Sequence, residues 1–185
     1  MKKSLGVKTL MYPMPVLIIT TYGEDGSVDA MNAAWGGIHN TNQIGICLSK
    51  EHKTVDNIFS KKAFTVSFAD VSHVAACDYV GLVSGHKEKN KLEKAGFTVS
   101  KAEKVDAPVI NELGLALECS FVSYDEESEY MVADIVNVLA EESVLTNGVI
   151  DPKKLQPITY DSANHKYIAL GEVVGSAFKD GLSLK

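Results

Sequence analysis

Arginine is absent from this chain of 185 residues, because all 18 of its basic residues are lysine. Any anion that the protein binds must therefore be held by lysine ammonium groups, hydroxyls or backbone N–H groups, since the bidentate guanidinium fork is not available. The net charge is −6, and no basic patch with interleaved aromatic residues occurs. This pattern argues against a nucleic-acid partner.

Cysteines and long apolar runs are also scarce. The three cysteines, Cys47, Cys77 and Cys119, are far apart and form no Cys-x-x-Cys pair, which argues against a disulfide framework or a cysteine-rich metal site. Each lies in an apolar stretch, so a buried free thiol is predicted for all three. No run approaches the ~20 apolar residues that span a bilayer, and no signal-peptide core is recognisable. We therefore expect a cytoplasmic protein without a membrane partner.

The usual catalytic and nucleotide-binding fingerprints are missing. The sequence contains no Gly-x-Gly-x-x-Gly, no P-loop, no His-Glu-x-x-His and no Gly-x-Ser-x-Gly. The five histidines are scattered and none is paired with another four residues away, so no metal site is predicted. No side chain is nominated as a catalytic nucleophile or base.

The pattern of apolar residues predicts one mainly β domain over residues 1–185. Frequent β-branched residues and alternation predict strands at 16–22, 28–35, 44–49, 63–69, 115–124, 130–139 and 167–178. Apolar residues at helical spacing predict helices at 54–62, 71–80 and 87–95. Many strands joined by hairpins, with a few helical insertions, indicate a closed or nearly closed antiparallel barrel.

The segment from Ser49 to Thr54 is the first candidate site. A strand is predicted to end at Ser49 and a helix to begin at Thr54, which is suited to be the N-cap. A helix N-terminus binds phosphate because it presents unpaired N–H groups and a partial positive charge. Lys50, His52 and Lys53 add further donors and charge. The same pattern is also typical of an ordinary capped connection between a strand and a helix.

Two further segments have the composition of ligand-binding backbone. In Asn32-Ala33-Ala34-Trp35, small residues lie between an amide and the only tryptophan, so a flat ligand can approach the main chain. The alternative is a packed strand with Trp35 in the core. The glycine-bracketed loop 81–86, followed by Lys91, either closes over a ligand or forms a plain turn between helices.

The order of these segments along the chain is more specific than any one of them. The ordered set is Tyr12-Pro13-Met14-Pro15-Val16, Thr20-Thr21, Asn32 to Trp35, His52-Lys53-Thr54, Phe64-Thr65-Val66-Ser67, Ser84-Gly85, Lys91, Ala107-Pro108-Val109-Ile110, Leu117-Glu118-Cys119 and Gly171-Glu172-Val173-Val174. From about Met11 to Gly175 the chain resembles the flavin reductase-like family, which includes the flavoredoxins. Lys50 stands where relatives often carry arginine.

The resemblance implies a Greek-key split β-barrel of the FMN-binding type, forming a homodimer with one FMN per subunit near the interface. Asn32 to Trp35 are expected along the isoalloxazine ring, Ser49 to Thr54 around the phosphate, and the segment from Ser84 to Lys91 as a closing element, in the same subunit or in the partner. The cofactor-binding residues expected in full are Asn32, Ala33, Ala34, Trp35, Leu48, Ser49, Lys50, His52, Thr54, Ser84, Gly85 and Lys91.

The resemblance also implies a redox role in which FMN supplies the electron chemistry. Two versions stay open: an NAD(P)H-dependent flavin or ferric reductase, and an electron carrier that is reduced by another redox protein. A rival interpretation is a non-enzymatic split-barrel module that binds another planar ligand, such as heme, or a partner protein.

Overall fold

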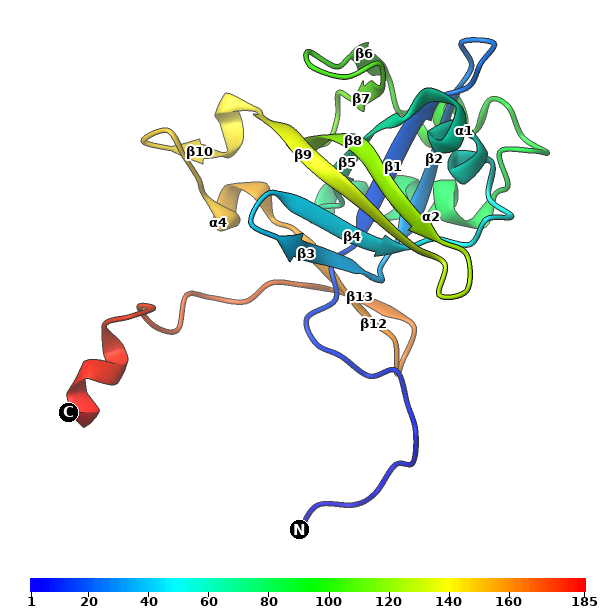
Figure 1. Cartoon of the computed structure of the whole chain (residues 1–185). Helices are drawn as coiled ribbons and strands as arrows, with labels where there is room; N and C mark the ends of the chain where they lie inside the picture. Colours follow the sequence, from blue (N-terminus) through cyan, green and yellow to red (C-terminus); the bar gives the residue numbers. More distant parts are fainter.

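Seven antiparallel strands form the central sheet of the protein, for which a computed structural model describes residues 1–185 (Figure 1). Their order across the sheet is β2-β1-β5-β8-β9-β4-β3. The strands are β1 (Leu17–Tyr22), β2 (Val28–Ala33), β3 (Gly36–Asn40), β4 (Gln43–Cys47), β5 (Ala63–Phe68), β8 (Leu115–Asp125) and β9 (Tyr130–Ala140).

The sheet curls because its two edge strands are neighbours in the sequence. Strands β2 and β3 lie at opposite edges, yet only Ala34 and Trp35 connect them. The Trp35 carbonyl accepts a hydrogen bond of 2.8 Å from the Cys47 N–H, which fastens this connection to β4. Two register shifts in the pairing of β8 with β9 add curvature. The result is a split antiparallel β-barrel, and the predicted fold class is confirmed.

Short helices and hairpins surround the sheet. The helices are α1 (Lys53–Lys61), α2 (Val74–Leu82), α3 (Lys91–Ala95) and α4 (Pro152–Leu155), with single 3-10 turns η1 (Val71–His73), η2 (Glu142–Val144) and η3 (Asp180–Leu184). The hairpins are β6 (Val99–Lys101) with β7 (Pro108–Ile110), β10 (Leu145–Thr146) with β11 (Val149–Ile150), and β12 (Ile158–Asp161) with β13 (Lys166–Ala169). No helix is both long and apolar enough to span a bilayer.

Two hydrophobic clusters cover the two faces of the sheet. Alternation along β1 sends Leu17 and Ile19 to a cluster that includes Val55 and Ile58 of α1, and sends Ile18 to a second cluster beside α2 and α3. Helices from both faces contact the edge strand β2. A site at this edge is therefore bounded by α1 on one side and by α2 and α3 on the other.

Most predicted elements are present with ends shifted by a few residues, but two are much shorter than predicted. The strand predicted at 167–178 ends at Ala169, because its only partner, β12, is four residues long and supplies no further hydrogen bonds. The helix predicted at 87–95 begins at Lys91. The residues before it form turns, in which the N–H groups of Lys87 and Glu88 both bond to the Ser84 carbonyl.

The cysteines differ in their exposure. Cys77 and Cys119 are buried, and burial raises the pKa of each thiol to about 12. Cys47 is exposed, so the prediction of a buried thiol is wrong at this position. Strand alternation explains the difference, because Ile44 and Ile46 point into the core and Cys47 consequently points outward at the end of β4.

We therefore expect Cys47 alone of the three thiols to react with Ellman's reagent without denaturation, at about pH 8. The other two have pKa values of about 12 and carry negligible thiolate at that pH, so they should react only after denaturation. Cys47→Ser should abolish the reaction of the native protein. Reaction of two or more thiols in the native protein would contradict this description of the core.

Candidate functional site

A cavity of about 230 Å³ lies where strand β2 meets α1, α3 and the loop after α2. Six of the residues predicted from sequence line this cavity, and they come from four separate segments of the chain: Asn32, His52, Thr54, Ser84, Gly85 and Lys91. The fold thus brings the anion-binding candidate, the small-residue strand and the glycine-bracketed loop to one place.

A buried carboxylate, Asp29 of β2, joins the walls of this cavity. Lys91 Nζ of α3 lies 2.8 Å from Asp29 Oδ1, and the two residues are only 2% and 4% exposed. Thr54 Oγ1 of α1 donates a hydrogen bond of 2.5 Å to Asp29 Oδ2. Lys91 Nζ also donates to the Val83 carbonyl at 3.2 Å, which ties the loop to the same group. The pair of Asp29 and Lys91 therefore links β2, α1, α3 and the loop after α2.

Two glycines, Gly81 near the end of α2 and Gly85 in the loop after it, are explained by this close packing. A Cβ at Gly85 would lie 2.2 Å from Asp29 Oδ1, and a Cβ at Gly81 would lie 2.7 Å from the Asn32 Cβ. Separations below 3.0 Å are not found between real Cβ atoms and their neighbours, so no side chain fits at either position. Glycine is needed because the backbone of the last turn of α2 and of the loop after it approaches β2 directly.

Thr54 does not cap α1, and this prediction is wrong. The helix begins at Lys53, with His52 at the N-cap position making no side-chain cap bond. The Thr54 hydroxyl donates instead to Asp29, because a buried charged acceptor forms the stronger hydrogen bond. The backbone N–H groups of Lys53 and Thr54 have no partner within the chain and are the free donors of this helix end.

Leu48, Ser49 and Lys50, in the connection from β4 to α1, lie outside the lining of this cavity. Leu48 is 2% exposed and accepts a 2.7 Å hydrogen bond from the Tyr124 hydroxyl at its carbonyl. The Ser49 carbonyl accepts from the His52 N–H at 3.2 Å. Lys50 forms an exposed ion pair of 3.7 Å with Glu126 in the turn between β8 and β9.

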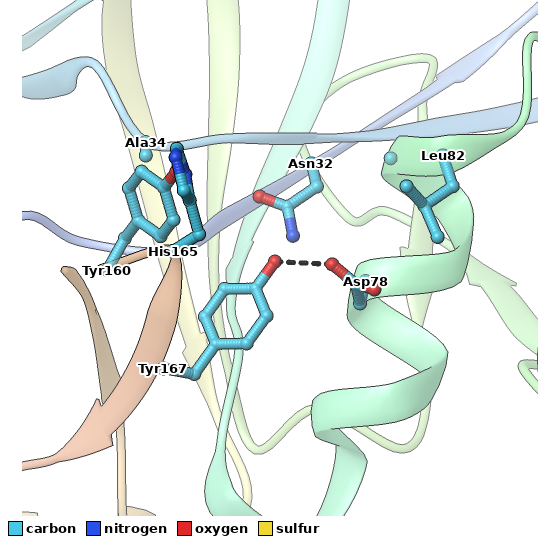
Figure 2. A pocket seen from close by; sticks show the side chains of 8 residues that line it. Asn32, Ala34, Asp78, Leu82, Tyr160, His165 and Tyr167 are labelled. Carbon is cyan, nitrogen blue, oxygen red and sulfur yellow. Dashed lines mark hydrogen bonds between the residues drawn. The ribbon is translucent and has the colours of Figure 1, made fainter. Parts of the chain in front are cut away.

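A second recess, of about 350 Å³, adjoins the cavity and shares Asn32, Gly81 and Leu82 with it. Figure 2 shows Asp78 of α2 and Tyr167 of β13 facing each other across this recess, joined by a hydrogen bond of 2.7 Å from the tyrosine hydroxyl. Burial, reinforced by the bond to Asp78, raises the pKa of Tyr167 well above its usual value. Asn32 Nδ2 donates to the Cys77 carbonyl at 3.0 Å, which fixes its amide.

The short connection after β2 faces this recess and a third opening. Ala34 lines the recess, whereas Ala33 packs against the first hydrophobic cluster. Trp35 is 54% exposed, so the alternative of a core tryptophan is wrong. Its ring lines an apolar groove of about 510 Å³ together with Ile38 and Cys47.

Sequence reasoning missed the residues that complete these openings, above all Asp29 and the pair of Asp78 and Tyr167. A carboxylate inside a predicted strand was a usable signal for Asp29, because such a group must be either exposed or paired. No signal for Tyr167 existed in the sequence, since the hairpin of β12 and β13 reaches α2 only through the tertiary fold.

The family of the chain follows from its similarity to known proteins. Residues 9–167 match the family described as "Flavin reductase like domain". The chain belongs to this family. Flavoredoxin of Desulfovibrio vulgaris (Miyazaki F) is 35% identical, with 98% of this chain and 100% of that chain covered and a TM-score of 0.94. Flavoredoxin from Methanosarcina acetivorans is 30% identical, with 100% of both chains covered and a TM-score of 0.89.

A more distant structure shares the fold. The FMN-binding domain of a flavin reductases-like enzyme from Shewanella baltica OS155 is 19% identical, with 88% of both chains covered and a TM-score of 0.79. The predicted family resemblance is confirmed by the family match and the two flavoredoxins, and the distant structure adds support for the split-barrel fold.

The donors around the 230 Å³ cavity fit a phosphate monoester. They comprise the ammonium groups of Lys53 and Lys91, the Ser84 hydroxyl, the His52 ring and two unpaired N–H groups at the start of α1. The adjoining recess, which the small residues Ala34 and Gly81 line together with the rings of Tyr160, His165 and Tyr167, fits a planar ring system. No group of three or more His, Cys, Asp or Glu side chains is placed to hold a metal ion.

Asp29→Asn should destabilise the protein by about 3–5 kcal/mol, because it leaves the buried Lys91 ammonium without a counter-charge. Chemical denaturation measures the change. Glu126→Gln is the matched control, since it breaks an exposed ion pair and should have little effect. The double variant Asp29→Asn/Lys91→Met should recover part of the loss. Equal stability of Asp29→Asn and the control would show that the buried pair does not hold these elements together.

Proposed function

We propose that this protein is a cytoplasmic homodimer that binds FMN and passes electrons through it, from NAD(P)H or from a redox protein. The observation that carries the proposal is a donor-lined cavity continuous with a flat recess along β2, in a chain of the flavin reductase-like family. The two flavoredoxins, similar over nearly their whole length, support a redox role.

The phosphate is proposed to lie in the cavity beside α1. The N–H groups of Lys53 and Thr54 point to the ligand from the helix end, and Ser84 and Lys91 approach from the opposite wall. Lys91 has three ammonium hydrogens, of which Asp29 and Val83 accept two, so one remains for the phosphate.

Leu48, Ser49 and Lys50 are proposed to line the entrance to this cavity, since they lead directly from β4 to α1. The ion pair of Lys50 with Glu126 is exposed and weak. Its ammonium can therefore turn to a phosphate at little cost.

The ring is proposed to lie along Asn32, Ala33, Ala34 and Trp35, where small side chains leave the backbone donors and acceptors accessible. FMN supplies the electron chemistry when bound, and the protein positions it and excludes water. The polar side chains that line the adjoining recess, and that a ligand there would meet, are those of Asn32, Asp78, Tyr160, His165 and Tyr167.

The purified protein should be yellow, with the absorption bands of oxidised flavin, and heating should release FMN and no FAD. The release is read by chromatography and mass. Flavin-free protein should regain the bands on addition of FMN. A colourless protein that takes up no FMN would overturn the proposal and favour another planar ligand or a protein partner.

The electron donor is tested by anaerobic mixing of the yellow protein with NADH or NADPH. Bleaching of the flavin band, with turnover when free flavin is added, supports the reductase version. A flavin that is bleached only by a reduced electron-transfer protein supports the carrier version.

A further inference from the structure

The chain exposes far more surface than a compact monomer of its size. Its accessible surface is 11247 Å², whereas a compact monomer of 20.0 kDa exposes about 8,700 Å². The excess, about 2,500 Å² per chain, is of the size that obligate homodimers bury. Both ends of the chain contribute to it, since residues 1–13 and 168–185 are all exposed.

The C-terminal tail, residues 171–185, carries the apolar part of this excess. Figure 1 shows the tail running away from the barrel (red) after it passes β13. Its last ion pair with the barrel joins Glu172 to Lys153 at 2.6 Å. Beyond that point, Val174 and Phe178 are 99% and 98% exposed, and Leu184 is 90% exposed. Large exposed apolar side chains of this density mark a contact surface.

The tail also has local structure, which distinguishes it from a solvated linker. The Ser176 N–H donates to Asp180 Oδ2 at 2.8 Å, and the 3-10 turn η3 follows. The tail carries as many lysines as acidic side chains, namely Lys179 and Lys185 against Glu172 and Asp180. The tail therefore lacks the high net charge that keeps a segment solvated.

The groove beside Trp35 is an apolar opening that the tail of the same chain does not enter. It has a volume of about 510 Å³, and no residue of the tail lines it. The groove runs between residues 8–11 of the N-terminal segment and the barrel, where the edge strand β3 and Cys47 of the neighbouring β4 line it. In β3, Ile38 is 75% exposed and Gly37 has no heavy atom within 4 Å of an added Cβ. An edge strand with bare backbone and apolar neighbours is a site where another chain packs.

We propose that the C-terminal tail of one copy lies in the Trp35 groove of a second copy, and that the exchange is reciprocal. The occupant is a second copy because the chain contains both an unpaired apolar tail and an unpaired apolar groove. In a dimer with a two-fold axis, each tail would fill the groove of the other copy. The areas agree with this, since the excess surface of each chain matches a large homodimer interface. The inference rests on the proposed homodimer and adds which segment crosses between its subunits.

Cys47 makes the exchange testable by disulfide trapping. It lines the groove and is the exposed cysteine, whereas Cys77 and Cys119 are buried. Three single variants, Val174→Cys, Phe178→Cys and Leu182→Cys, sample the tail, because a disulfide needs Cα atoms within about 7 Å. After mild oxidation, at least one of them should migrate as a covalent dimer on a non-reducing gel, and the additional change Cys47→Ser should abolish it.

Val149→Cys is the matched control, because it places a thiol at a 68% exposed valine outside the tail and should give no cross-link to Cys47. Failure of all three tail variants to cross-link would overturn the exchange, as would a disulfide between Cys47 and the tail of the same copy. The flavin bands of each sample are recorded separately. A colourless cross-linked dimer would contradict FMN binding and leave the exchange standing, whereas a yellow dimer in which no tail variant cross-links would contradict the exchange alone.

Light scattering provides an independent measurement. Phe178→Asp should weaken self-association by at least about tenfold, because it would place a charge in an apolar groove. Lys185→Asp, at the end of the tail, should leave the dimer unchanged. Equal association of Phe178→Asp and the wild type would overturn the proposal.

Discussion

The buried ion pair between Asp29 and Lys91 holds the candidate site in shape. Burying two charges is unfavourable unless each has several partners. Here the carboxylate accepts from Lys91 and Thr54, and the ammonium donates to Asp29 and to the Val83 carbonyl. The pair therefore links segments that are distant in sequence. The end of α2 and the loop after it can approach β2 because Gly81 and Gly85 carry no side chains.

Because the chain has no arginine, the positive side chains of the candidate site are all lysines. A guanidinium would bind phosphate in a fixed fork, whereas a lysine ammonium is a compact charge whose direction depends on its neighbours. Asp29 supplies that direction for Lys91. The remaining attraction for an anion comes from the backbone N–H groups of Lys53 and Thr54 at the start of α1, which are free because His52 at the N-cap position makes no side-chain cap bond.

Local sequence patterns predicted most elements but not the contacts between them. Alternation in residues 63–69 and helical spacing after Thr54 gave β5 and α1 closely. The strand predicted after Tyr167 is too long because its length depends on a partner, β12, that the local pattern does not specify. Thr54 illustrates the same limit at the site, since its capping role was lost to Asp29, a residue 25 positions earlier.

The predicted site residues also separate into two groups for a physical reason. Asn32, Ser84 and Lys91 converge on one cavity because β2 is an edge strand that helices contact from both faces. Lys50 is turned toward Glu126, because an exposed side chain pairs with whatever opposite charge is nearest. Trp35 was ambiguous in the sequence, and its exposure follows from its place in the two-residue connection between the sheet edges.

The most direct test of a phosphate site beside α1 is the calorimetric comparison of FMN with riboflavin on flavin-free protein. The two ligands share the ring and differ in the phosphate. FMN should bind at least about tenfold more tightly, a difference of about 1.4 kcal/mol. The difference in affinity between FMN and riboflavin should become smaller as salt is added and when Lys53 is replaced by alanine. Equal affinities for FMN and riboflavin would contradict the assignment of this cavity to the phosphate.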